Sequence, residues 1–256
     1  MAISSLSSLL PRTLIQAMAP AAGTRYPSHL RLFFPSKPHR HPLKTLFPST
    51  SGSPLLPAIS AIHFEDLVEK DWSFLDADPA DSDRARRADR AIAAAEVGEK
   101  SRVLACLPTA GFVDRLVETA PCELVLANHE SLLVLAEIKE RHDAVRCWQG
   151  GVEAVPERFS PLDAVFICYL PAMSVTVNEL LGMLARRCSP GARVVISCEE
   201  GREGVERVHR QQHPDMVTSD LPNKQSLEKA AADNSFQMSE FIDEPSFYLA
   251  VLKFCR

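Results

Sequence analysis

Near its C-terminus the chain reads QMSEFIDEPSFYLAVLKF, from Gln237 to Phe254, and this stretch decides how the rest can fold. Two extended runs, Gln237–Asp243 and Phe247–Phe254, are separated by Glu244, Pro245 and Ser246 alone. Because a parallel crossover needs roughly a dozen residues, the two runs must pair as an antiparallel hairpin. The second run is apolar on both of its faces, which predicts a strand inserted into a sheet that helices cover on both sides.

Upstream of the hairpin, short apolar runs alternate with segments of helical spacing. A run of roughly four to eight apolar residues between turn formers is typical of a buried parallel strand. Five such runs are present: Arg102–Leu107, Glu123–Ala127, Val145–Trp148, Asp163–Tyr169 and Ala192–Cys198. Helices are expected to start at caps such as Ser82, Ser174 and Ser226, to cover Asn128–His142 and, more weakly, Arg202–Gln212, and to stop at Gly98 and at Ser189–Gly191.

Together these elements predict an α/β fold, namely a Rossmann-like seven-stranded sheet with a C-terminal antiparallel hairpin and helices on both faces. This order resembles the class I S-adenosylmethionine-dependent methyltransferase superfamily. Gln149–Glu153 (QGGVE), then Pro156 and Leu162–Val165 (LDAV), is similar to the family's Q-G-D-A-E, L-P and F-D-V-V run. Ser189–Ile196 (SPGARVVI) is similar to the K-P-G-G-R-L-V-I entry to strand five. The likeness covers residues 82–256 and is greatest to small-molecule methyltransferases of the quinone-biosynthesis type.

The resemblance implies that S-adenosylmethionine binds at the carboxyl ends of the strands, and it indicates which positions would contact it. These are Leu107, Thr109 and Gly111 in the first loop, Asn128 and His129 after the second strand, and Gly151, Val152 and Glu153 in the third loop. Tyr169, after the fourth strand, and Glu199, after the fifth, are the side chains best placed to orient or deprotonate a methyl acceptor.

The acidic anchors of the family are missing from these positions. The family's first loop is D-x-G-x-G-x-G, and here the corresponding residues are Ala105, Leu107, Thr109 and Gly111. Ala127 or Asn128 stands where an acid normally takes both ribose hydroxyls, a bidentate contact that neutral side chains make poorly. Gly151 replaces the acid that accepts from the adenine amino group.

The remaining polar residues also have simpler explanations. Thr109 and Asn128 stand where loops meet helices, so capping and turn roles are their default, and Glu153 has the character of a surface charge. His209 and His213 are spaced i, i+4, but without a third ligand they predict no metal site. Trp72 and Phe74 precede the predicted domain, where they either anchor an N-terminal arm or face the substrate.

Two hypotheses for function therefore stay open. The first is a plastid methyltransferase that uses S-adenosylmethionine on a small-molecule or isoprenoid-type acceptor. The second is a catalytically inactive methyltransferase-fold protein that serves as an assembly or interaction module, with a plastid protein as its partner. A dehydrogenase is a distant third, because the terminal hairpin does not suit a dinucleotide fold.

The first 64 residues have the composition of a targeting peptide. They contain ten Ser, nine Pro and six Lys or Arg, and no Asp or Glu before Glu65. The uncharged opening MAISS is similar to chloroplast transit peptides, which predicts a stromal location. The expected organisation is a transit peptide at residues 1–60, an arm at 61–81 and the methyltransferase-like domain at 82–256. Seven cysteines without a C-x-x-C spacing fit a reducing compartment.

Charge narrows the range of partners. Residues 65–256 carry 22 basic and 33 acidic side chains, a net charge of about −11, which disfavours nucleic acid as a ligand. The arginines of Arg84–Arg90 alternate with aspartates, the pattern of a solvated helix face. No run of roughly 18 apolar residues is present, so no transmembrane segment is predicted.

Overall fold

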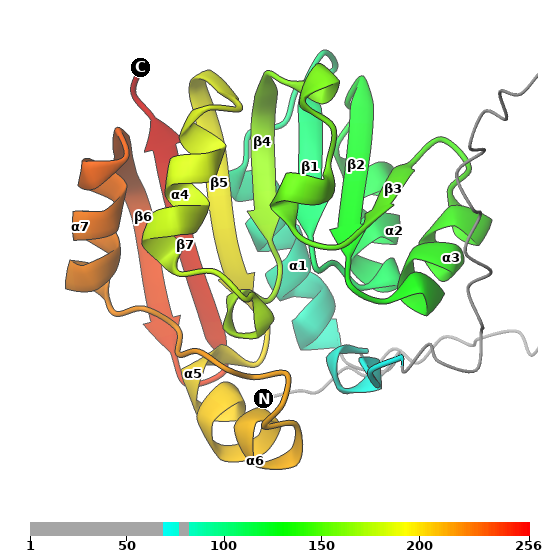
Figure 1. Ribbon diagram of the computed structural model, residues 1–256, viewed down its shortest axis with the longest axis vertical. Coiled ribbons are helices and arrows are strands. Elements are labelled where there is room, and N and C mark those ends of the chain that lie inside the picture. The colour runs from blue at the N-terminus through cyan, green and yellow to red at the C-terminus, as the bar shows by residue number, and fades with distance from the viewer. Residues whose placement is uncertain (1–68, 77–81) are drawn as a thin grey trace, which may run out of the picture. The chain divides into compact units, whose positions relative to one another are not determined.

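The computed structural model describes residues 69–76 and 82–256, all within the compact unit Ser60–Arg256. Its centre is a seven-stranded sheet in the order β3-β2-β1-β4-β5-β7-β6 (Figure 1). The first five strands are parallel, whereas β7 is antiparallel to both of its neighbours. The strands are β1 (Arg102–Cys106), β2 (Leu124–His129), β3 (Arg146–Gln149), β4 (Leu162–Ile167), β5 (Cys188–Cys198), β6 (Phe236–Glu244) and β7 (Phe247–Phe254). The predicted α/β fold class is confirmed.

The C-terminal hairpin has the predicted geometry. Strand β7 is inserted between β5 and β6, and only Pro245 and Ser246 join it to β6. Its alternate residues enter different cores. Phe247, Leu249 and Val251 pack with one buried cluster, and Tyr248, Ala250 and Leu252 pack with the other.

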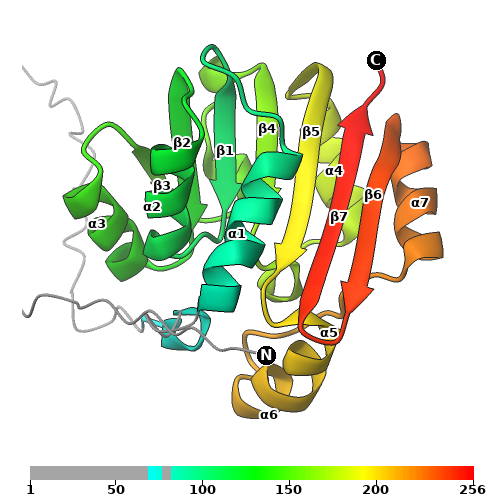
Figure 2. The same ribbon diagram turned by 180° about the vertical axis from the view of Figure 1, so that it is seen from behind.

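Helices cover both faces of the sheet. One face carries α1 (Ser82–Ala94), α2 (Ala110–Thr119) and α3 (Leu132–Arg141), which stand in front in Figure 2. The other carries α4 (Val177–Ala185) and α7 (Lys224–Asp233), in front in Figure 1. Below the carboxyl ends of β5 and β6 lie α5 (Gly201–Gly204), the π-helical turn η6 (Val205–His209) and α6 (Arg210–Gln212). Apolar helix residues on each side complete the two cores.

Several predicted helix boundaries were wrong, because other residues make better caps. Helix α4 is capped by Thr176 rather than Ser174. The Thr176 hydroxyl accepts from the Glu179 amide at 3.3 Å, and the Glu179 carboxylate accepts from the Thr176 amide at 2.9 Å, so two orphan donors are satisfied together. Likewise, Asn223 rather than Ser226 caps α7, since its side chain accepts from the Ser226 amide.

Two other segments differ from expectation in kind. Asn128 and His129 belong to strand β2, and α3 starts only after a cap at Ser131. Ser189–Gly191, expected to end a helix, lies within β5, which begins at Cys188 and pairs there with Leu162. Arg202–Gln212 lies in a helical stretch that continues through Gly204 by widening to a π turn.

The short helix η2 (Ser73–Leu75) lies at the carboxyl ends of the parallel strands. Its neighbour Trp72 is buried and meets His129 edge-on, with 4.7 Å between ring centroids. Phe74 contacts Tyr169 edge-on at 5.8 Å and stacks on His213 at 4.2 Å. These residues therefore anchor the arm across the ends of β2 and β4. Within the described part of the chain, no helix has both the length and the apolarity that a membrane span needs.

Candidate functional site

In the turn after β1, a leucine adopts a backbone conformation that favours glycine. Leu107 has a φ of 51°, in the left-handed region that costs a residue with a Cβ about 1–2 kcal/mol. Its amide donates to the Asn128 carbonyl at 2.9 Å, which holds the turn against β2. The side chain is buried and fills the space that a glycine would leave open.

Two first-loop candidates have structural roles that account for them. The Thr109 hydroxyl accepts from the Phe112 amide at 3.1 Å and caps α2. Gly111 lies in the first turn of that helix, and a Cβ added to it would meet nothing closer than the Thr109 hydroxyl at 4.0 Å. No close backbone approach therefore requires glycine at Gly111.

Asn128 lies at the end of β2 and is only partly satisfied. Its amide nitrogen donates to the Gly150 carbonyl at 2.9 Å, which ties β2 to the loop after β3. Its side-chain oxygen is buried and has no hydrogen-bond partner among the described residues. A buried unpaired acceptor costs about 1–3 kcal/mol, so this oxygen is the clearest unfilled polar position in the site.

His129 is enclosed beside it. Its Nδ1 accepts from the Ser131 amide at 2.9 Å, so the proton of the neutral ring is on Nε2. Burial lowers the pKa of His129 to about 4. The ring is therefore neutral at physiological pH and serves as a packing partner of Trp72.

The candidate residues of the third loop do not lie at the same cavity as those of the first loop. Val152 and Glu153 border a different cavity from Leu107 and Thr109. A Cβ on Gly151 would lie 2.5 Å from a carboxylate oxygen of Glu153. An aspartate at Gly151 would therefore displace and repel the carboxylate already present.

Both candidate catalytic residues are engaged with other side chains. The Tyr169 hydroxyl lies 2.8 Å from His209 Nδ1, and both residues are buried. Burial raises the pKa of Tyr169, so its hydroxyl stays protonated at physiological pH and the phenolate that could deprotonate an acceptor is not populated. The candidate metal ligand His209 is thus a partner of Tyr169, and the described residues contain no cluster of three metal-binding side chains.

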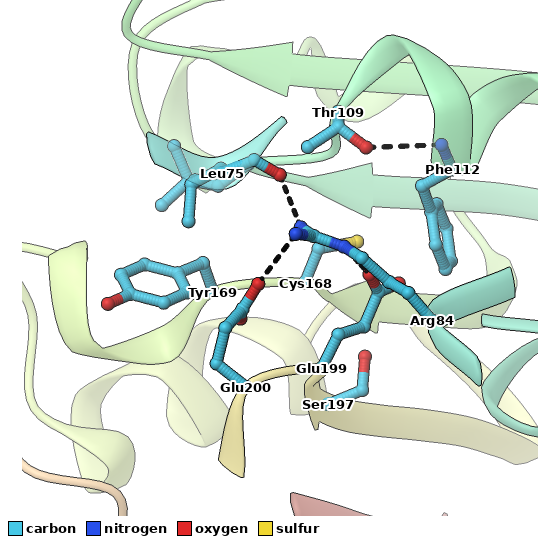
Figure 3. A pocket seen from close by; sticks show the side chains of 10 residues that line it. Leu75, Arg84, Thr109, Phe112, Cys168, Tyr169, Ser197, Glu199 and Glu200 are labelled. Atoms are coloured by element: carbon cyan, nitrogen blue, oxygen red, sulfur yellow. Dashed lines mark hydrogen bonds and ion pairs between the residues drawn. The ribbon is translucent and has the colours of Figure 1, made fainter. Parts of the chain in front are cut away.

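Glu199 lies in an ion pair that sequence reasoning missed. The Arg84 guanidinium is 2.5 Å from the Glu199 carboxylate and 2.9 Å from that of Glu200. It also donates to the Leu75 carbonyl of the arm (Figure 3). Burial raises the pKa of Glu199, and Arg84 opposes that rise.

The prediction that the arginines of α1 form a solvated face was wrong for two of them. Helix α1 begins beside the carboxyl end of β5, and residues three apart on a helix lie on the same face. The Arg87 guanidinium donates to the Glu199 carbonyl at 2.9 Å, next to the contact of Arg84. In the sequence, the alternation of these arginines with aspartates suggested that they are all solvent-exposed. The i, i+3 spacing of Arg84 and Arg87 places both on one face of the helix and could have indicated their common contact with Glu199.

S-adenosylmethionine does not fit the cleft as it stands. Leu75, Arg84, Leu107 and Tyr169 border a remaining cavity of about 20 Å³. That volume holds about one water molecule, whereas small-molecule pockets measure about 300–1,000 Å³. Leu75 of the arm and Arg84 of α1 thus leave no room for a nucleoside in this cleft.

Comparison with known proteins identifies the fold. No family model and no curated protein matches the sequence. An S-adenosylmethionine-dependent methyltransferase from Mesorhizobium loti superposes with a TM-score of 0.54 at 15% identity, over 66% of this chain and 99% of the other. The chain has the class I methyltransferase fold.

Other solved structures share this methyltransferase fold. Geranyl diphosphate C-methyltransferase from Streptomyces coelicolor A3(2), in complex with Mg²⁺, geranyl diphosphate and S-adenosyl-L-homocysteine, gives a TM-score of 0.54 at 14% identity, over 73% of this chain and 89% of that one. A chain of a complex containing the Trm112 methyltransferase activator of Haloferax volcanii gives 0.57 at 16%, over 68% and 91%. At such identities the likeness establishes the fold alone.

Proposed function

We propose that this protein is a catalytically inactive member of the methyltransferase fold that serves as an assembly or interaction module in the chloroplast stroma. One observation carries the proposal: Arg84, held by Glu199 and Glu200, fills the cleft in which a cofactor would lie. An inserted ligand would have to break this ion pair and leave its charges partly buried, which is costly.

The residues at the strand ends support the same conclusion. By the family resemblance, Ala105 stands where an acid would hold the methionine amino group, and Ala127 or Asn128 stands where an acid would hold the ribose hydroxyls. Leu107 adds a buried side chain to a turn that elsewhere in the fold is lined by glycine. The cleft thus lacks the charges that recognise S-adenosylmethionine and contains the chain's own side chains instead.

The partner in this proposal is a plastid protein. One structure that shares the fold comes from a complex with a protein activator, so the scaffold is compatible with a protein partner. The acid-free first 64 residues support delivery to the plastid.

A second candidate is a methyltransferase of the quinone-biosynthesis type, acting on a small-molecule or isoprenoid-type acceptor. The unpartnered oxygen of Asn128 and the retained left-handed turn at Leu107 favour it, since both are features that a nucleoside could use. This function would require Leu75 and Arg84 to leave the cleft.

Calorimetric titration of the full chain with S-adenosylmethionine and S-adenosylhomocysteine separates the two candidates. The interaction module predicts no saturable heat with either ligand and no transfer of label from methyl-labelled S-adenosylmethionine. Stoichiometric binding of either nucleoside would reject it in favour of the enzyme.

A further inference from the structure

A second and larger cavity lies outside the cleft. Its volume is about 320 Å³, within the range of small-molecule pockets. It is bordered by the end of α4 and by the connection from β3 to β4, which contains the short helices η3 (Val152–Ala154) and η4 (Glu157–Phe159). None of its lining residues also lines the Arg84 cleft. The cavity is therefore a separate feature of the molecule.

Arg187 is the buried charge at this cavity. It lies between α4 and β5 with 8% of its surface exposed. Its guanidinium donates to the Val152 carbonyl at 2.8 Å, the Pro156 carbonyl at 3.3 Å and the Ser160 hydroxyl at 3.4 Å. All three acceptors are neutral. Among the described residues, no carboxylate lies within ion-pair distance of Arg187.

This arrangement differs from that of Arg84 and Arg202, two other partly buried arginines. Arg84 and Arg202 each meet a carboxylate, at 2.5 Å and 2.8 Å respectively. An arginine keeps its positive charge at any pH at which proteins are folded, so it cannot escape burial by losing a proton. A buried charge is normally paired with an opposite charge. The Arg187 guanidinium has five N–H groups and uses three of them here. An anion in the adjoining cavity would supply the missing counter-charge.

The neighbouring residue Arg186 is a second cation at this cavity. The Arg186 side chain is exposed, borders the cavity and has no hydrogen bond or ion pair with any described residue. Two adjacent guanidinium groups at one cavity match a carboxylate or phosphate, which arginine binds through charge-assisted and often bidentate hydrogen bonds.

The same cavity limits how much negative charge a ligand can carry. Glu153 and Glu157 also border it, and neither forms an ion pair with a described residue. Their carboxylates would repel a polyanion and would accept hydrogen bonds from a donor at the other end of a small ligand. Met183 adds an apolar part to the lining.

We propose that this cavity binds a small molecule through one carboxylate or phosphate group, which Arg187 and Arg186 hold. The proposal does not depend on whether the cleft binds a nucleoside, because the two places share no lining residue.

The test uses the full chain with inorganic phosphate and acetate as probes. Binding is followed by calorimetry and by the melting temperature, with chloride at equal ionic strength as the reference. We expect saturable binding of at least one of the two anions at millimolar concentration, weakened about tenfold or more by Arg186→Gln. The matched control is Arg146→Gln, which removes the same charge from an exposed arginine on β3 that has no ion pair with a described residue.

A further variant, Arg187→Lys, keeps the charge but loses the forked geometry, and it too should weaken binding while a cooperative melt reports that the protein is folded. The proposal is overturned if neither anion binds saturably beyond chloride. It is also overturned if Arg186→Gln and Arg146→Gln weaken binding equally, since that result would indicate only the general charge of the protein.

Discussion

The guanidinium of Arg84 lies 2.5 Å from a carboxylate oxygen of Glu199, and this pair joins α1 to the end of β5. Both side chains are largely enclosed, with 14% and 19% of their surface exposed. The contact lies at the carboxyl ends of the parallel strands, where Arg84 and Glu199 border the small remaining cavity. Whether the cleft is open or filled therefore depends on Arg84, a residue of the first helix.

Replacing Arg84 by methionine should destabilise the protein. Glu199 and Glu200 would be left partly buried without their cation, and breaking such a pair costs about 3 kcal/mol. Urea unfolding measures the change. The control is Arg86→Met, because Arg86 is exposed and its ion pair is with the exposed Asp83, so its loss should cost less than about 1 kcal/mol. Equal losses in the two variants would contradict a special role for Arg84.

Introducing an acid at Asn128 should lower stability rather than create a cofactor site. The new carboxylate would be buried and would face the Gly150 carbonyl, to which the asparagine now donates. We expect a loss of about 2 kcal/mol or more and no stabilisation by S-adenosylmethionine in thermal melts.

The matched control for this variant is Asn178→Asp. Asn178 is exposed and accepts from the Asn234 side chain, a bond that a carboxylate can keep. An Asn128→Asp protein that melts higher in the presence of S-adenosylmethionine would instead support the methyltransferase candidate.

His129 should make the protein less stable in mild acid. Its pKa is about 4 in the folded protein, against an ordinary value of 6.5 for a solvated histidine, so between these pH values only the unfolded state takes up the proton. Stability should fall by about 3 kcal/mol at most as the pH drops from 6.5 to 4. Burial also lowers the pKa of His209, which adds to the effect with the same sign.

Denaturant unfolding across this pH range tests the prediction. His129→Asn keeps an acceptor for the Ser131 amide but does not titrate, so its stability should change less with pH. His213→Asn, at a half-buried residue stacked on Phe74, is the comparison. A pH dependence that is unchanged in His129→Asn would refute the assignment.

Deleting the last eight residues, from Leu249 onward, should leave insoluble protein. Strand β7 pairs with β5 on one side and β6 on the other, so its loss opens two sheet edges and exposes both cores. Deletion of Cys255 and Arg256 alone, which follow the strand, should be tolerated. Soluble expression and a cooperative melt of the longer deletion would show that the hairpin is dispensable.

The N-terminal segment should act as a chloroplast targeting signal. Residues 1–64 fused to a fluorescent reporter are expected to deliver it to chloroplasts and to be trimmed there, because the segment is basic, rich in serine and free of acids. Imaging and the size of the recovered reporter provide the measurement. Fluorescence restricted to mitochondria or cytosol would contradict chloroplast targeting.

The sequence alone determined the sheet and its hairpin. Local features predicted the strands and the hairpin, since short apolar runs indicate buried strands and a connection of only a few residues before Phe247 requires antiparallel pairing, whereas the resemblance supplied the arrangement of the whole sheet. The alternation along β7 correctly assigned its residues to two buried faces for the same reason, because side-chain direction in a strand has a fixed period of two. Helix caps were less predictable, as Thr176 and Asn223 show, because neighbouring polar residues compete for the same role.

Only the tertiary structure decided the state of the cleft. The resemblance indicated that acids are missing at Ala105, at Ala127 or Asn128, and at Gly151, but not which side chains lie near these positions in the structure. Arg84 and Glu199 are 115 positions apart, and their contact depends on how α1 crosses β5. The unpaired charge of Arg187 is equally invisible in the sequence, since its burial and the absence, among the described residues, of a carboxylate within ion-pair distance are properties of packing. Local pattern thus fixes the elements, whereas contacts between distant side chains depend on the assembled fold.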